Sequence, residues 1–277
     1  MGPQPTLRCP CGEKHLKEAL RYDAPPTGEI EFSFPGEYQR SYSCCEICGH
    51  YFSCHDIDMK SLYDSDYLSA TYGGIEGVVE AFRRISNLPS ERSDNHHRIE
   101  RVSKFADQWL EVGGIDRRLI DIGSGLGVFV FGMKSLGWQC TALDPDERFS
   151  QHARQNTGVD TLTCDFTLAK FDNVGRFQCI ALNKVLEHVE DPVGFLLKAK
   201  ELLGETGFIY VEVPDGEMAS HDGGEREEFF VDHHHVFSSV SLSNMTVRAG
   251  LTLQQLGRLR EPSGKFTLFA FLTAVSS

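Results

Sequence analysis

The hydrophobic residues in the second half of this 277-residue chain fall into short runs separated by amphipathic stretches. Five runs predict buried strands, at residues 118–122, 139–143, 160–164, 177–182 and 207–213. The intervening stretches have helical character, and this alternation predicts a doubly wound parallel sheet of the α/β class. Two last runs, Leu251–Leu259 and Lys265–Ala274, have no helix between them and predict an antiparallel edge hairpin.

The stretch before these strands is predicted to be helical. One helix should end at Leu88-Pro89, and a second should begin after Ser93-Asp94-Asn95. We therefore expect a helical cap over residues 59–115, followed by a sheet domain over residues 116–277.

The first 58 residues are distinguished by their cysteines. Cys9-Pro-Cys11-Gly and Cys45-Glu-Ile-Cys48-Gly-His50 have the form of two metal-binding knuckles. Four thiolates around Zn²⁺ would form a closed structural site and supply stability that so small a segment lacks. We expect a small zinc-ribbon domain over residues 1–58, with a hairpin formed by Ile30–Phe34 and Tyr38–Tyr42. Because the first knuckle is one residue shorter than C-x-x-C, Cys44, Cys54 and His55 are alternative ligands, and free thiols are the alternative to a metal site.

Residues 119–127 form the most informative motif. An apolar strand end runs into the turn Gly123-Ser124-Gly125-Leu-Gly127 and then into a helix. Such a turn lets a ligand approach bare backbone at a helix N-terminus. Asp121 precedes the glycines, and a carboxylate there favours a cationic ligand over a pyrophosphate.

Polar residues follow the other predicted strands. Asp144-Pro145 ends the second strand, 23 residues after Asp121, where an acid that binds ribose hydroxyls is expected. Asp165-Phe166 ends the third strand and could bracket an adenine ring. Asn183-Lys184 ends the fourth, close to His188. Ligands of doubly wound sheets bind at these carboxyl ends.

These motifs resemble the class I S-adenosylmethionine (SAM)-dependent methyltransferases over about residues 98–277, with their Rossmann-like seven-stranded sheet. The glycine turn resembles their first motif, Asn183-Lys-Val-Leu-Glu187-His188-Val-Glu-Asp191-Pro192 their fourth-strand signature, and Gly207–Pro214 their fifth strand. The resemblance implies that Gly123 and Gly125 pack against SAM, Asp144 binds its ribose, Asp165 reads its adenine amine and Asn183 lies near its amino-acid moiety. The full expected cofactor set is Asp121, Gly123, Ser124, Gly125, Gly127, Asp144, Pro145, Asp165, Phe166, Asn183, Lys184 and His188. An NAD-binding site is the alternative, but the Gly-x-Gly-x-x-Gly spacing is absent.

The N-terminal cysteines narrow the resemblance to sugar methyltransferases that act on nucleotide-linked or glycan sugars. Tyr63–Tyr67 resembles the tyrosine-rich stretch of these enzymes, and Phe229–Ser238 their histidine segment. In the C-methylating members a tyrosine and a histidine transfer protons. The order His-Glu-His of those enzymes is replaced here by His-His-His.

The candidate catalytic residues are therefore His233, His234, His235 and Tyr67. A histidine is the natural proton acceptor for a hydroxyl or a carbon acid near neutral pH. Alternatively, the three histidines could be exposed to solvent, one of them could cap the next helix, or they could bind a divalent metal ion together with Asp232 or Glu228.

Composition limits the partners. The net charge of −13 argues against nucleic acid and anionic membranes, and no apolar run is long enough to span a bilayer. We expect a cytoplasmic enzyme that methylates a small polar acceptor, most simply a sugar on a nucleotide or glycan carrier. The alternatives are a non-sugar metabolite, protein or RNA as acceptor, or a binding module whose ribbon docks a partner. Nothing in the sequence sets the oligomeric state.

Overall fold

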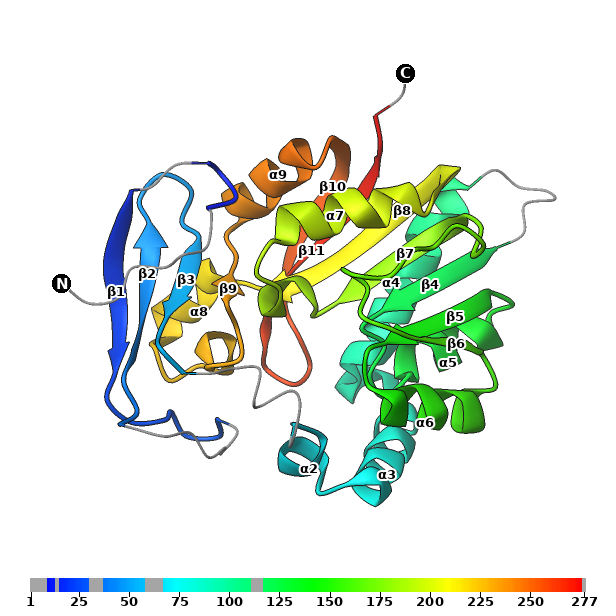
Figure 1. Cartoon of the computed structure of the whole chain (residues 1–277), viewed down its shortest axis with the longest axis horizontal. Coiled ribbons are helices and arrows are strands. Elements are labelled where there is room, and N and C mark those ends of the chain that lie inside the picture. Colours follow the sequence, from blue (N-terminus) through cyan, green and yellow to red (C-terminus); the bar gives the residue numbers. More distant parts are fainter. Residues whose placement is uncertain (1–8, 13–14, 30–36, 58–66, 111–116, 276–277) are drawn as a thin grey trace.

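The computed structural model describes residues 9–12, 15–29, 37–57, 67–110 and 117–275, with only the backbone of residues 67, 69 and 70. Among these residues, no helix is long and apolar enough to cross a membrane. The strands form two sheets, which lie next to each other in Figure 1.

The larger sheet has seven strands in the order β10-β11-β8-β7-β4-β5-β6. Its strands are β4 (Arg118–Ile122), β5 (Gln139–Asp144), β6 (Asp160–Thr163), β7 (Phe177–Asn183), β8 (Leu203–Pro214), β10 (Leu251–Arg260) and β11 (Phe266–Ala274). Strands β4 to β8 are parallel, whereas β11 runs antiparallel to both β8 and β10. The predicted α/β sheet with an antiparallel edge hairpin is therefore confirmed. The strand order reverses between β4 and β7, which makes their carboxyl ends the expected ligand site.

Helices cover both faces of this sheet, as Figure 1 shows. The helices of the described residues are α2 (Tyr67–Tyr72), α3 (Ile75–Ser86), α4 (Asp94–Trp109), α5 (Val128–Ser135), α6 (Glu147–Thr157), α7 (Pro192–Glu201), α8 (Gly216–Asp222) and α9 (Ser239–Arg248), with short 3-10 turns η1 (Ser90–Arg92), η2 (Leu186–His188) and η3 (Glu227–Phe229). Alternate residues of each strand enter opposite cores. In β4, for example, Ile120 packs in the core under α7 and α9, whereas Leu119 packs in the core under α4 and α5.

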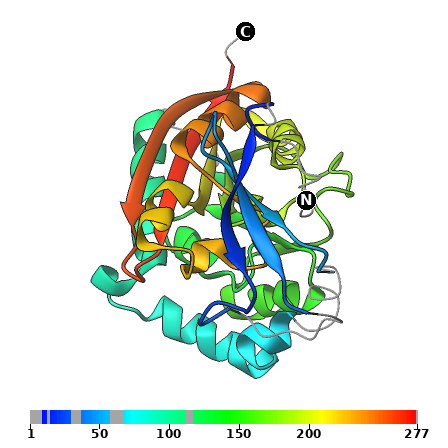
Figure 2. The ribbon, with the colours of Figure 1, turned by 90° about the vertical axis from the view of Figure 1, so that its left-hand side faces the viewer.

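The smaller sheet joins the N-terminal segment to a distant part of the chain. Its order is β1 (Leu16–Tyr22), β2 (Arg40–Cys45), β3 (Tyr51–Cys54) and β9 (His235–Val236). All three pairings are antiparallel, and β9 pairs with β3. Figure 2 shows this sheet from the side of the N-terminal segment. The fourth strand of the sheet thus comes from the predicted histidine segment.

The predicted hairpin of the N-terminal segment is only partly matched. Tyr38–Tyr42 overlaps β2, whereas Ile30–Phe34 lies outside the described residues. β2 pairs with β1 and with β3. The sequence did not indicate β1, because only its last residue, Tyr22, is buried. The domain limits at residues 58 and 115 stay predictions.

Candidate active site

The glycine turn joins β4 to α5 at the carboxyl ends of the parallel strands. Gly123, Gly125 and Gly127 have φ angles of 74°, 48° and 73°, which strain residues that carry a side chain. The amides of Gly123 and Ser124 donate to Leu143 O at 2.8 and 3.0 Å and fasten the turn to β5. A Cβ atom on Gly125 would meet no atom within 4 Å. The backbone at Gly125 is therefore open to a ligand.

Asp144 directs its carboxylate to this turn from the end of β5. Its Oδ2 accepts a hydrogen bond from Gly125 N at 2.9 Å, and its Oδ1 accepts one from Asp146 N at 3.0 Å. Burial raises the pKa of Asp144 to about 6, although both hydrogen bonds act in the opposite direction. A carboxylate held in this way can accept hydrogen bonds from ligand hydroxyls.

Asp121 and Asn183 connect the two strands between which the sheet order reverses. Asn183 Nδ2 donates to Asp121 Oδ1 at 2.9 Å. Burial raises the pKa of Asp121 to about 7. Asn183 Oδ1 and Ser124 Oγ are buried without a hydrogen-bond partner among the described residues. Such unpartnered buried atoms are rare in native proteins and call for donors from outside the chain.

The two residues after β6 that were expected to bracket an adenine ring, Asp165 and Phe166, make contacts within the protein instead. Asp165 is exposed and accepts hydrogen bonds from Thr167 N and Oγ1 at 2.7 and 2.6 Å. Phe166 is only 3% exposed, and its ring centroid lies 4.7 Å from that of Phe195 and 5.2 Å from that of Phe171. The phenyl ring is part of the hydrophobic core, which disfavours the expected contact with an adenine ring; that contact stays a prediction.

The two polar residues at the end of β7 turn to different partners. Lys184 has a left-handed φ of 59°, and its Nζ donates to Thr267 Oγ1 on β11 at 2.8 Å. It is thus directed toward β11, not toward the glycine turn. His188 ends η2, and its Nδ1 lies 2.8 Å from Asp232 O. Pro145, the last expected cofactor residue, is exposed after β5.

His235 does not have the surroundings of a general base. It is completely buried, with its Nδ1 2.9 Å from His50 Nε2 and its Nε2 3.4 Å from Glu190 O. Burial lowers the pKa of His235 to about 4. Because both ring nitrogens lie beside partners inside the protein, these surroundings favour a structural role for His235, and its catalytic role stays a prediction.

His233 and His234 lie at the end of β7 and are half-buried. His234 N donates to Glu187 O at 2.7 Å. The ring centroid of His233 lies 5.0 Å from that of His188. Strand-like alternation would place His233 and His235 on one face, but the strand β9 begins only at His235. The first two histidines of the triplet therefore lie beside the fourth-strand signature.

The helical cap packs near the glycine turn. Leu68 of α2 and Val78 of α3 share a hydrophobic cluster with Leu126, which follows Gly125 directly, and with Phe149 of α6. The side chain of Tyr67, a predicted catalytic residue, lies outside the described residues. The backbone of Tyr67 begins α2.

The fold and the strand ends can be compared with known proteins. A family model described as a methyltransferase domain matches residues 93–256. The chain belongs to this family. The resemblance of the glycine turn and the fourth-strand signature to methyltransferases is thus confirmed at the level of the family, whereas the sugar-methyltransferase subgroup stays a prediction.

Curated relatives of this methyltransferase-domain protein include ubiquinone biosynthesis O-methyltransferases. That of Methylocella silvestris is 23% identical over 164 residues, which cover 56% of this chain and 62% of that one. That of Caulobacter sp. is 34% identical over 101 residues, or 34% of this chain and 39% of that one. The chain spans less than two thirds of the length of these relatives.

Solved structures share the methyltransferase fold. Magnesium protoporphyrin IX methyltransferase from Synechocystis PCC 6803, with bound SAH, has a TM-score of 0.58 and 12% identity over 78% of this chain and 100% of that one. A 1,6-didemethyltoxoflavin-N1-methyltransferase from Burkholderia thailandensis, with S-adenosylhomocysteine, has a TM-score of 0.55 and 13% identity over 91% of this chain and 100% of that one. At these identities the likeness shows the fold alone.

A cluster of four cysteines lies in the N-terminal segment, ahead of the methyltransferase domain. The Sγ atom of Cys9 lies 3.2 Å from that of Cys11 and 3.4 Å from that of Cys48, and those of Cys11 and Cys45 are 3.8 Å apart. Sulfurs around a tetrahedral Zn²⁺ lie about 3.8 Å apart, given Zn–S bonds of about 2.3 Å. The chemistry and spacing of these four donors fit zinc.

The alternative zinc ligands lie outside this cluster. Cys44 Sγ contacts Cys45 O at 3.8 Å, and Cys54 Sγ contacts Ser43 Oγ at 3.6 Å. His55 Nδ1 accepts a hydrogen bond from Ile57 N at 3.2 Å.

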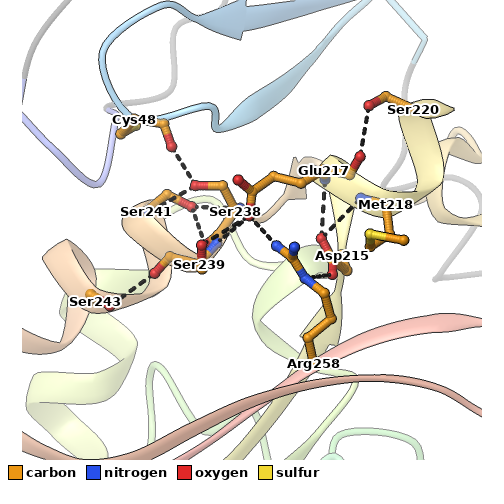
Figure 3. A network of polar contacts seen from close by, with 10 residues as sticks. All are labelled: Cys48, Asp215, Glu217, Met218, Ser220, Ser238, Ser239, Ser241, Ser243 and Arg258. Carbon is orange, nitrogen blue, oxygen red and sulfur yellow. Dashed lines mark hydrogen bonds and ion pairs between the residues drawn. The ribbon is translucent and has the colours of Figure 1, made fainter.

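A polar network attaches the cysteine cluster to the methyltransferase sheet (Figure 3). Ser238 Oγ, at the N-cap of α9, donates to Cys48 O. Ser239 N and Oγ both donate to Glu217 Oε2, at 3.0 and 2.9 Å, and Arg258 of β10 forms an ion pair with Glu217. The second cysteine knuckle is therefore fixed to the start of α9 and, through α8, to the edge hairpin.

Two residues to which the sequence assigned no role lie at notable positions in the fold. His50 follows the second knuckle in sequence, but only the structure places its ring against Ser241 Oγ, 3.0 Å away, and against His235. Glu187 lies in the fourth-strand signature, and its carboxylate is buried without a hydrogen-bond partner among the described residues. The sequence offered a signal for Glu187, because an acid followed by a histidine came directly after a buried strand.

Proposed function

We propose that this chain is a SAM-dependent methyltransferase that transfers a methyl group to a small polar acceptor. The observation that carries the proposal is a group of acidic and polar side chains at the point where the strand order of the sheet reverses. There, the buried carboxylates of Asp121 and Asp144 accompany two unpartnered acceptors, Asn183 Oδ1 and Ser124 Oγ, beside an open glycine turn. This acidic, acceptor-rich surface suits a ligand with positive charge and hydroxyl groups.

Each residue has a role that follows from its contacts. Bound at this site, SAM would supply a methyl group attached to a positively charged sulfur. Asp144 would accept hydrogen bonds from ribose hydroxyls, and Asn183 Oδ1 would accept one from the ammonium group. Asp121 holds the Asn183 amide in place. Among the predicted catalytic residues, we propose His234 as the base; its backbone amide is fixed to Glu187 O at the end of β7.

We propose oxygen as the methylated atom, because the curated relatives are named O-methyltransferases. A sugar on a nucleotide or glycan carrier is the proposed acceptor, supported by the cysteine cluster ahead of the domain and by the histidine segment that pairs with its sheet. A non-sugar hydroxyl compound is the second candidate, and the names of the relatives favour it.

Titration calorimetry with SAM, followed by turnover assays on sugar nucleotides and on phenolic metabolites, tests the proposal. We expect SAM binding with about one site per chain, and methylated product from one of the two panels. Absence of SAM binding by the folded protein would overturn the proposal. Binding without turnover on any acceptor would support the alternative of a binding module.

A further inference from the structure

A second group of potential metal ligands lies at the end of β7. Glu187, His188 and His233 each offer one ligand atom, and these atoms all lie within 4.8 Å of one another. The residues come from η2 and from the segment before β9, which are adjacent because His234 N donates to Glu187 O. The group is separate from the four cysteines.

The carboxylate of Glu187 has an unusual environment. The residue is 1% exposed, and neither carboxylate oxygen has a hydrogen-bond partner among the described residues. Burial of an ionised carboxylate is strongly unfavourable unless a partner compensates for it. Lys184 attracts Glu187 electrostatically, but its Nζ donates its hydrogen bond to Thr267 Oγ1 and not to the Glu187 carboxylate. Within the part of the chain that the structure describes, the carboxylate therefore lacks a direct cationic partner.

Each of the two histidines has its Nδ1 beside a backbone carbonyl. His188 Nδ1 lies 2.8 Å from Asp232 O, and His233 Nδ1 lies 2.8 Å from Glu228 O. A carbonyl oxygen only accepts, so both Nδ1 atoms carry the proton, and Nε2 of a neutral ring then presents its lone pair. Metal-binding histidines are commonly held by such a bond from the other nitrogen to a carbonyl or carboxylate.

We propose that Glu187, His188 and His233 bind one divalent transition-metal ion, with Zn²⁺ as the reference ion. Two imidazoles and one carboxylate are the protein ligands of several catalytic zinc sites, in which a further position stays open. Metal–ligand distances of about 2.0–2.2 Å place the ligand atoms of a tetrahedral site about 3.4 Å apart, so the three side chains would have to close by no more than about 1.4 Å. The ion would neutralise the buried carboxylate.

A metal ion at this position would also take part in acceptor binding. This second step rests on the proposed methyltransferase function. A hydroxyl oxygen of the acceptor would occupy the open position, and a bound cation lowers the pKa of such a hydroxyl. The site therefore favours acceptors that present oxygen donors. Metal binding itself does not depend on the identity of the acceptor.

Cobalt(II) distinguishes the two sites, because only the cysteine cluster gives thiolate-to-cobalt charge-transfer absorption. The protein is first saturated with Zn²⁺ and treated with a mild chelator, so that zinc stays with the four thiols; Co²⁺ is then titrated. We expect one equivalent to bind with only the weak d–d bands of nitrogen and oxygen ligands. His233→Ala and the isosteric Glu187→Gln should each weaken this binding by at least about 100-fold. His221→Ala, at an exposed histidine of α8, is the matched control and should bind as the unaltered protein does.

Failure to bind Co²⁺ outside the thiolate site, or equal affinity in Glu187→Gln, would overturn the metal assignment. Circular dichroism and SAM affinity of each variant establish that it is folded. If SAM binds but Co²⁺ does not, the metal assignment fails and the proposed function stands. If Co²⁺ binds but SAM does not, the proposed function fails and the metal site stands.

Discussion

His50 Nε2 lies 2.9 Å from His235 Nδ1, and both residues are completely buried. His50 belongs to the N-terminal sheet, and His235 to the segment after β8. The rings of both also pack edge-on against Phe52, with centroid distances of 4.6 and 5.6 Å. One hydrogen bond inside an aromatic cluster thus joins the cysteine-bearing segment to the methyltransferase domain.

Replacement of His235 by alanine should weaken this junction. The change removes a buried imidazole and leaves His50 Nε2 without its partner, so we expect the free energy of unfolding to fall by about 1–3 kcal/mol. Thermal and urea unfolding measure the loss. His221→Ala, at an exposed site, should leave stability unchanged; an equal effect of both changes would contradict the structural role.

Asp144→Ala should reduce SAM affinity by more than about 10-fold, since it removes the carboxylate proposed to bind the ribose and a hydrogen bond to Gly125. Calorimetric titration of the folded variant gives the affinity. The matched control is Asp160→Ala, at an exposed position on the neighbouring strand β6. Unchanged SAM affinity in Asp144→Ala would remove the cofactor assignment.

The affinity for SAM should rise with pH between about 5 and 8. Burial raises the pKa of Asp121 to about 7 and that of Asp144 to about 6, so in the free protein both carboxyls retain protons into this range. A cationic ligand favours the ionised forms, and its binding near pH 6.5 should release protons. Calorimetry in two buffers of different ionisation enthalpy measures this release, which Asp121→Asn should diminish.

The carboxyl groups of Asp121 and Asp144 should also make the stability of the folded protein depend on pH. Their contribution to stability should fall as pH rises, whereas the affinity for SAM should increase. Because the folded-state pKa of each is raised, the native protein binds more protons than the unfolded chain between about pH 4 and 7. Their contribution to stability is therefore fully present below about pH 4 and is lost as pH rises through 6 to 7. The stability of Asp121→Asn should depend less on pH across this window.

Cys45→Ser combined with Cys48→Ser should release zinc from the purified protein and destabilise the N-terminal sheet. Half of the ligand set is lost, and the remaining two thiols cannot close a tetrahedral site. Metal content by mass spectrometry checks this outcome. Cys44→Ser is a close control, because Cys44 is adjacent in sequence but outside the cluster, and it should retain zinc. Loss of zinc in Cys44→Ser instead would indicate a different ligand set.

His234→Ala should lower turnover by roughly 10²–10⁴-fold, if His234 accepts the acceptor proton, without a change in SAM affinity. Single-turnover rates with the identified acceptor separate the chemical step from binding. His97→Ala, at a half-buried histidine of α4, serves as a control. A wild-type rate in His234→Ala would exclude the base role.

Local patterns were sufficient to predict much of the sheet. The strands from residue 118 onward are marked by apolar runs and glycine turns, and Asp121, Gly123 and Asp144 occupy the strand ends that such runs specify. Ser93, predicted to begin a helix, accepts a hydrogen bond from His96 N as the N-cap of α4. These features depend on residues close together in sequence.

The remaining features depend on contacts between distant segments. β1 is exposed along most of its length, so its hydrophobic pattern is weak, and its position is set by pairing with β2. Phe166 turns inward because Phe195 of α7 packs over it. The buried environment of His235 arises from His50, which is 185 residues away in sequence. No pattern within a single segment contains this information.

The pairing of β3 with β9 also sets an order of assembly during synthesis. The four clustered cysteines have all emerged once residue 48 has left the ribosome, whereas the strand that completes their sheet contains only His235–Val236. Before His235–Val236 has been synthesised, one edge of β3 has no partner strand. Unpaired strand edges can form hydrogen bonds with other chains and cause aggregation. A nascent chain stalled between these points is therefore expected to need a chaperone, and metal loading would be the earliest event in its maturation.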